Sequence, residues 1–227
     1  MLTEKEILSN WEEFKTITKK ISSRGDMLLE MYSQIGEENV ILAPASSQID
    51  FHNAFPGGYI DHVLRVTKFS LKFYKLYEEL GMKVDNFSKE ELLFSALHHD
   101  LGKLGYNTGN EHYLKNESEW HVKNQGKIYE KNPNIPFMTI QDRSLYLLNF
   151  YGIKVSLNEF ISIRTHDGIY DETNKPYLMS FNLSDKQRIN LPTILHFADF
   201  TSYRFELERM ILKNPEKAKT FYKDLKI

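Results

Sequence analysis

The sequence contains no cysteine, so disulfides, thiolate zinc sites and cysteine nucleophiles are excluded. Any bound metal ion must therefore be held by nitrogen and oxygen atoms. The chain also has little net charge, with 29 basic and 31 acidic residues, and so no overall positive field draws it to nucleic acid. It lacks an apolar run near the roughly 20 residues of a membrane span. The opening stretch, MLTEKEILSNWEEF, is too acidic for a signal peptide, and we expect a cytoplasmic protein without membrane contact.

Helix signals dominate what is present. Hydrophobic residues make up 41% of the 227 residues and charged residues 26%, which is ordinary for a soluble globular chain with a sizeable core. Capping boxes begin at Thr3, Ser88 and Ser156, each with a glutamate three positions later. No run of alternating polar and apolar residues indicates strands. The prediction is an all-α fold, with helices expected over 3–17, 26–35, 58–81, from 88, over 143–151, from 156 and from 192.

The chain divides into two parts on this reading. Residues 1–50 are predicted to form an N-terminal helical appendage packed on the core, and residues 51–227 the main domain. Two long polar stretches, after Lys103 and after Gly168, read as loops, and the first is long enough to suggest a functional role. The lysine-rich tail from Lys213 is expected to be a solvated surface.

The stretch SALHHDLGKLGY carries the strongest chemical signal. It places His98, His99 and Asp100 at the end of an apolar helix, which we expect to stop at Gly102 with a left-handed backbone. Lys103 follows directly, so two kinds of metal ligand lie beside a cation suited to phosphate. Neighbouring positions on a helix point about 100° apart. Other elements must therefore complete the shell of any ion bound here.

Three further helices offer such groups. His62 and Val66 lie at helical spacing, and this puts His62 on a buried face of its helix. A lone histidine there is more often a core residue than a ligand, but His166 ends a second helix, and His196 and Asp199 share a face of a third. Asp199 lies in the apolar context HFADF and needs a cation, because burying an unpaired carboxylate is costly. Arg204 is expected to face elsewhere. Packing gives no reason for four helices each to bury a histidine or aspartate, and we therefore favour a ligand role for His62.

The order of these residues resembles the HD superfamily of metal-dependent phosphohydrolases. The H…HD…D pattern corresponds here to His62, His99-Asp100 and Asp199. The stretches HNAFPGGYIDH, HDLGK, THDG and HFAD are similar to those of the HD domain in bacterial 3′–5′ exoribonucleases, with Asp167 standing where a second histidine is usual. The resemblance covers roughly residues 50–205. It extends neither to the first fifty residues nor to the nucleic-acid-binding module of those enzymes.

The resemblance implies an HD-domain helical bundle and a ligand set. His62, His99, Asp100 and Asp199 would hold one divalent ion, which lowers the pKa of a bound water and polarises a phosphoryl oxygen. A second ion would be held by His166 and His121, with Asp100 bridging. The sequence does not distinguish Mn, Mg, Ni, Fe and Zn.

Several neighbours receive supporting roles. Asp61 is a candidate hydrogen-bond partner for His62, and His196 is expected to orient Asp199 or to join a local polar network. His98 is expected to be a packing neighbour, and His112 a substrate or surface residue.

Two cations are candidates for binding the substrate. Lys103 is expected to neutralise phosphate charge in the transition state. Asp100 and Lys103 are the predicted catalytic residues. The alternative for Lys103 is a solvated lysine that complements the helix dipole. Arg164 is a weaker phosphate candidate, and a surface ion pair explains it equally well. Tyrosines in the loops offer stacking surfaces for a base, although such residues are commonly half-buried packing.

These features predict a phosphohydrolase acting on a phosphomonoester or phosphodiester of a nucleotide or short oligonucleotide. A 3′–5′ exonuclease is the nearest alternative, but the near-neutral charge argues against a stable complex with long nucleic acid. A di-iron oxygenase of the HD type and a non-catalytic nucleotide-binding module are further alternatives. The sequence leaves the substrate and the oligomeric state open.

Overall fold

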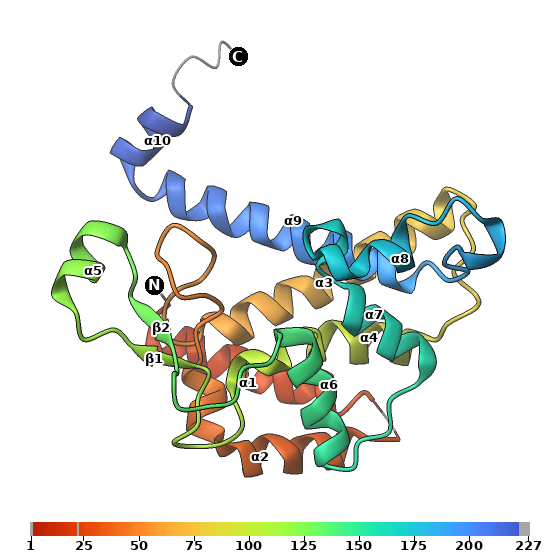
Figure 1. The fold of residues 1–227 in the computed structure, drawn as a ribbon, viewed down its shortest axis with the longest axis horizontal. Helices are drawn as coiled ribbons and strands as arrows, with labels where there is room; N and C mark the ends of the chain where they lie inside the picture. Colours follow the sequence, from red (N-terminus) through yellow and green to blue (C-terminus); the bar gives the residue numbers. More distant parts are fainter. Residues whose placement is uncertain (1, 22, 223–227) are drawn as a thin grey trace.

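A computed structural model describes residues 2–21 and 23–222 and shows a helical protein with one small sheet (Figure 1). The predicted all-α fold is confirmed. The α-helices are α1 (Glu4–Thr18), α2 (Gly25–Leu42), α3 (Gly58–Glu79), α4 (Lys89–His98), α5 (Glu119–Gln125), α6 (Ile140–Phe150), α7 (Leu157–Thr165), α8 (Lys175–Leu178), α9 (Leu191–Leu212) and α10 (Pro215–Phe221). Short 3-10 helices are η1 (Leu101–Leu104), η2 (Gly168–Tyr170), η3 (Glu172–Asn174) and η4 (Leu183–Asp185), and the strands are β1 (Tyr113–Lys115) and β2 (Tyr129–Lys131).

The capping boxes set the starts of three helices, as predicted. Thr3, Ser88 and Ser156 each accept a hydrogen bond from the backbone N–H three residues on, and the glutamate there accepts one in return. This reciprocal pair satisfies two amides that the first turn leaves without helical partners. The starts of these three helices are thus local properties of the sequence.

The core is shared by the first two helices and the rest of the bundle. One apolar cluster contains Trp11, Phe14, Leu28, Tyr32, Ile35, Tyr59, Val63, Phe94, Leu97 and Leu148. The hydroxyl of Tyr32 on α2 also lies 2.8 Å from Nε2 of His98 on α4. The helices α1 and α2 therefore complete the core of the bundle; the division of the chain at residue 50 remains a prediction.

Two long helices give the site its frame. α3 packs along α9, and α4 and α7 pack against both α9 and each other. In Figure 1, α9 runs along one side of the bundle and α10 continues from its end away from the body. Because α4 and α7 both end near α3 and α9, the side chains at their C-terminal ends can meet residues from the long helices.

The stretch after Lys103, expected as a loop, contains more regular structure than the sequence indicated. β1 and β2 pair antiparallel, with Tyr113 opposite Lys131, and α5 lies between them. Figure 1 shows this hairpin and α5 at the edge of the bundle, at the end of α9 that leads to α10. The three-residue strands are too short to give an alternating pattern. The later loop, after Gly168, likewise holds η2, η3, α8 and η4.

Gly102 does not end α4 with a left-handed turn, as had been expected. α4 ends at His98, and Gly102 lies inside η1, whereas the positive φ of 82° belongs to Gly105. Gly102 is required for close packing instead: a Cβ there would collide with the carbonyl oxygen of Ile140 on α6. Its N–H donates to Oγ of Ser144 over 2.8 Å. Gly102 thus allows the segment that contains His99 and Asp100 to pack closely against α6.

A positive-φ glycine also lies within α2. That helix was expected to end near Ile35, but it continues to Leu42 past Gly36, whose φ of 110° is non-helical.

Among the described residues, no helix is both long enough and apolar enough to cross a membrane.

Candidate metal centre

Four elements bring histidine and aspartate side chains to one buried place. His62 comes from α3, His99 and Asp100 directly follow α4, His166 follows α7, and Asp199 comes from α9. Nε2 of His62 lies 3.1 Å from Oδ1 of Asp199 and 3.5 Å from Oδ2 of Asp100. Nε2 of His99 lies 3.4 Å from Oδ2 of Asp100 and 3.8 Å from Oδ1 of Asp199. The predicted ligand set is therefore assembled in space.

His166 joins this group from the other side. Its Nε2 lies 3.8 Å from Oδ1 of Asp100, and its ring meets that of His99 edge to face at a centroid distance of 4.8 Å. The donor atoms of His99, His166 and Asp199 all lie within 4.8 Å of one another, as do those of His62, His99 and Asp100. Asp100 thus faces ligands of both groups, the position expected of a bridging carboxylate.

The imidazole nitrogens that face the cluster lack hydrogen bonds within the described chain. Nε2 of His62 and Nε2 of His99 are both fully buried without a hydrogen-bond partner, although carboxylate oxygens lie close by. Buried polar atoms are normally paired, and an unpaired one is costly. Nitrogen and carboxylate oxygen donors of this kind suit a divalent transition metal ion. The residues present fit a metal ion.

The other ring nitrogen, Nδ1, is hydrogen-bonded to a backbone carbonyl oxygen in both His99 and His166. Nδ1 of His99 lies 2.9 Å from the carbonyl oxygen of Ala96, and Nδ1 of His166 lies 2.8 Å from that of Ile163. A carbonyl oxygen only accepts, so each Nδ1 carries the hydrogen. In the neutral ring, Nε2 is then left with its lone pair, which is the form that binds a metal.

His62 is anchored by a residue that the sequence interpretation missed. Its Nδ1 donates to Oε1 of Glu206 on α9 over 3.1 Å, and Glu206 also accepts from Arg65. Asp61, the expected partner of His62, instead pairs with Nη2 of Arg65 over 2.9 Å, because neighbouring side chains on a helix diverge. A signal did exist: Glu206 follows Asp199 by two helical turns, so both lie on the same face of α9.

The charges of the cluster shift its pKa values strongly. Burial opposes a charged imidazole, but the carboxylates of Glu206 and Asp199 raise the pKa of His62 to about 10. Burial also opposes the charged form of Asp100, yet Lys103 and His99 hold its pKa well below the usual range. The pKa of Asp199 is lowered against its burial by His62 and His99. The site is thus built for cations next to anionic carboxylates.

An open pocket of about 550 Å³ lies against this cluster. Lys103 lines it, and its Nζ donates to Oδ2 of Asp100 over 2.6 Å. Arg204 also lines the pocket, so the expectation that it faces elsewhere was wrong. The aromatic rings of Tyr170, Phe200 and Tyr203 form part of the wall. The pocket therefore combines two cations with aromatic surface beside the candidate ligands.

His52 is a further residue of this wall. Its ring lies 4.8 Å from that of His62, centroid to centroid, and its Nε2 is buried without a hydrogen-bond partner in the described chain. Burial and the nearby Lys103 hold the pKa of His52 well below its ordinary value. The sequence matched His52 only as part of a longer motif and assigned it no role.

Two predicted site residues lie apart from the cluster. His121 is on α5, where its Nδ1 lies 2.8 Å from Oγ of Ser118, and it does not line the pocket. Its role as a metal ligand remains a prediction. Arg164 donates to Oδ1 of Asn174 over 3.0 Å and to Oγ1 of Thr173 over 2.8 Å. These contacts, with carboxylates on both sides, use the guanidinium to fix the loop after α7.

The remaining histidines have structural partners. His196 does not bond Asp199; its Nδ1 donates to the carbonyl oxygen of His166 over 2.7 Å and so supports the end of α7. His112 is buried rather than exposed, with Nδ1 2.7 Å from Nη1 of Arg143, and burial lowers its pKa to about 3. His98 is a core packing residue, as expected, and burial lowers its pKa to about 3.

Comparisons with protein-family models, with curated proteins and with solved structures gave no match. The fold and the geometry of the site therefore define the class by themselves. This is an all-α protein whose buried histidine–aspartate cluster could bind a metal ion.

Proposed function

We propose that this protein is a metal-dependent phosphohydrolase of the HD type, acting on a phosphomonoester or phosphodiester of a nucleotide or short oligonucleotide. One observation carries the proposal. The four residues in the H…HD…D order come from α3, from the segment directly after α4 and from α9, and they meet in a buried cluster that borders an open pocket lined by cations. Packing alone gives no reason to collect such groups in a core.

The contacts support the proposed ligand roles. His62, His99, Asp100 and Asp199 would hold the first ion, and His166 with Asp100 offers a place for a second. When bound, a divalent ion supplies a water of lowered pKa and polarises a phosphoryl oxygen. Glu206 keeps the hydrogen of His62 on Nδ1, away from the ion.

Lys103 and Arg204 would bind the phosphate. An ammonium has three donors, and the bond from Lys103 to Asp100 uses one of them. The others remain for oxygens in the pocket, where negative charge grows in the transition state. Lys103 is largely buried, with 12% of its side chain exposed, so this interaction is weakly screened by solvent. Arg204 is more exposed and suits binding of the ground state.

The aromatic wall supports a nucleotide over a simpler phosphate ester. Tyr170 and Phe200 are stacked, with ring centroids 6.0 Å apart, and both line the pocket with Tyr203. Bases stack on such rings with an energy of about 1–3 kcal/mol per base. The net charge of −2 favours a short substrate. Binding of long single strands would fall by about 0.7 log units per phosphate contact for each tenfold rise in salt, and we expect a weak salt dependence instead.

The test is to remove bound metal from the protein, add manganese and measure hydrolysis of nucleotides, cyclic nucleotides and oligonucleotides. Asp100→Ala should lose both bound metal and hydrolysis while its circular dichroism spectrum stays helical. Asp85→Ala, at an exposed position outside the site, is the matched control. An active, metal-free Asp100→Ala protein would overturn the proposal.

Other outcomes lead to the alternatives. Tight, salt-sensitive binding of long single strands with stepwise shortening from the 3′ end would assign an exonuclease. Stoichiometric iron with a visible absorption band, and no hydrolysis, would assign an oxygenase. Nucleotide binding without turnover in the presence of every tested metal would assign a binding module.

A further inference from the structure

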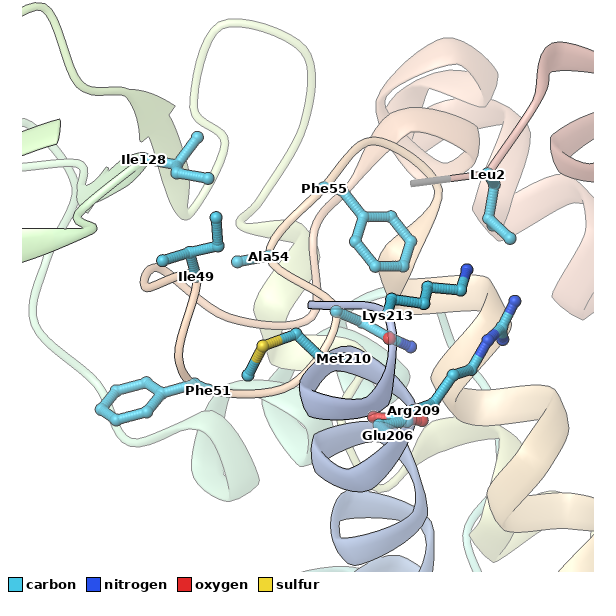
Figure 2. A pocket seen from close by; sticks show the side chains of 11 residues that line it. Leu2, Ile49, Phe51, Ala54, Phe55, Ile128, Glu206, Arg209, Met210 and Lys213 are labelled. Atoms are coloured by element: carbon cyan, nitrogen blue, oxygen red, sulfur yellow. The ribbon is translucent and has the colours of Figure 1, made fainter. Parts of the chain in front are cut away.

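A second cavity, of about 270 Å³, lies at the C-terminal half of α9. Figure 2 shows it between the segment 49–55, the strand-bearing hairpin and α9. Glu206, which bonds His62, forms part of its wall. None of the residues that line this cavity also lines the pocket beside the candidate metal centre. The two spaces are distinct.

The wall of this cavity is mostly apolar. It is lined by Ile49, Phe51, Ala54, Ile128 and Met210. Phe51 is 48% exposed and Ile49 is 45% exposed. Figure 2 shows Ile49 and Ile128 on the side away from the charged residues, with Met210 between. Large apolar side chains gathered around a hollow are typical of a ligand site. The apolar part of a ligand would lie here.

Two positively charged side chains line the other end of this cavity. Arg209 and Lys213, one turn apart on α9 and directly after it, line the cavity together (Figure 2). Within residues 2–21 and 23–222 no ion pair is made by Lys213, and the carboxylate nearest to Arg209 is that of Asp61, at 4.0 Å.

The carboxylates nearby already have partners. Glu6, whose pKa is lowered by Thr3 and then by the charges of Arg209 and Lys213, accepts from the backbone N–H and the hydroxyl of Thr3 over 2.7 and 2.8 Å. Glu206 accepts from Arg65 and from His62, and Asp61 pairs with Nη2 of Arg65 over 2.9 Å. Positive charge at this end of the cavity is therefore available to a ligand. An anionic head group matches it.

We propose that this cavity binds a medium-chain alkyl carboxylate, with the chain against Ile49, Ile128 and Met210 and the carboxylate at Arg209 and Lys213. The size sets the chain length. An engineered cavity of about 150 Å³ accommodates benzene, so a cavity of 270 Å³ suits about ten carbon atoms. Decanoate is the matching probe. This site is independent of any phosphoester chemistry at the metal centre.

The experiment is isothermal titration of the full-length protein with decanoate below its micellar concentration. We expect saturable binding of one decanoate per protein chain. Decanol should bind more weakly because it lacks the negative charge, and acetate should bind more weakly because it lacks the alkyl chain. The double variant Arg209→Gln/Lys213→Gln should weaken decanoate binding about tenfold, since each cation at an exposed site contributes modestly. Lys75→Gln/Lys186→Gln removes two exposed positive charges elsewhere and should leave it unchanged.

The apolar end is tested separately by Ala54→Leu, which fills the cavity from a buried position and should abolish binding. The charge variant changes surface residues only, so it remains informative if Ala54→Leu does not fold. The proposal is overturned if decanoate shows no saturable binding. It is equally overturned if decanol binds as tightly as decanoate, or if the Arg209/Lys213 variant binds decanoate like the wild type.

Discussion

Glu206→Gln should weaken metal binding without altering any predicted ligand. Glu206 is 3% exposed and accepts from Nδ1 of His62, which is fully buried. The substitution keeps the shape of the side chain and removes its charge. The imidazole of His62 then becomes a weaker base, and a glutamine at this position can also turn its NH₂ group towards the ring. Both effects disfavour the ligand form of His62.

The expected magnitude follows from the class of contact. Replacing the carboxylate partner of a ligand histidine costs about 10–100-fold in metal affinity, or about 1.4–2.7 kcal/mol. The pair is buried and so little screened by solvent, which favours the upper half of this range. Arg65 loses one charged partner but retains Asp61 at 2.9 Å, so the fold should survive.

The assay is titration of the metal-free protein with manganese, with the thermal midpoint measured in parallel. Glu208→Gln, an exposed position on the same helix, provides the matched control and should bind manganese like the wild type. A folded Glu206→Gln protein with wild-type metal affinity would refute the role assigned to Glu206.

Further predictions address the site and its support. Lys103→Ala should lower kcat about 100-fold, more than it raises KM, in steady-state assays, because the ammonium acts on charge that develops in the transition state; a pure KM effect would contradict this. His166→Ala should lower the metal content by about one ion per chain, measured by mass spectrometry of the metals, if Asp100 bridges two ions; an unchanged content would leave a mononuclear centre. In the metal-free protein, the raised pKa of His62 stabilises the fold fully below about pH 6.5, and this contribution is lost as the pH rises through about 10. Urea midpoints should therefore fall across that window, and a flat profile would argue against a charged His62. Gly102→Ala should cost about 3 kcal/mol of unfolding free energy in urea titrations, because its Cβ meets backbone oxygen on α6; a wild-type midpoint would show that α6 can shift.

The sequence alone was sufficient for the all-α fold and for the starts of three helices, although it did not indicate α5, α8 or α10. The starts at Thr3, Ser88 and Ser156 depend on contacts within four residues, and so they can be read locally. Helical periodicity placed His62 on a buried face, and the apolar setting of Asp199 showed that it needs a positive partner. Such inferences concern one element at a time and need no knowledge of how elements cross.

Partners from different elements were decided by the tertiary structure. His62 and Glu206 are 144 positions apart and meet only because α3 and α9 pack along each other. Adjacency in sequence favoured Asp61 instead, although neighbours on a helix diverge. The same limit applies to Arg204, which reaches the pocket because the wall is built from several elements.

Close packing and enclosed space also lie beyond sequence patterns. Gly102 was read as a helix end because glycine commonly serves there, whereas its hydrogen substituent is required by the approach of α6. The cavity beside Arg209 depends on how the segment 49–55 and the hairpin meet α9. A sequence determines which side chains prefer burial and, where a capping box is present, where a helix begins. The shape of the space between helices depends on their relative placement, and that is a property of the folded chain as a whole.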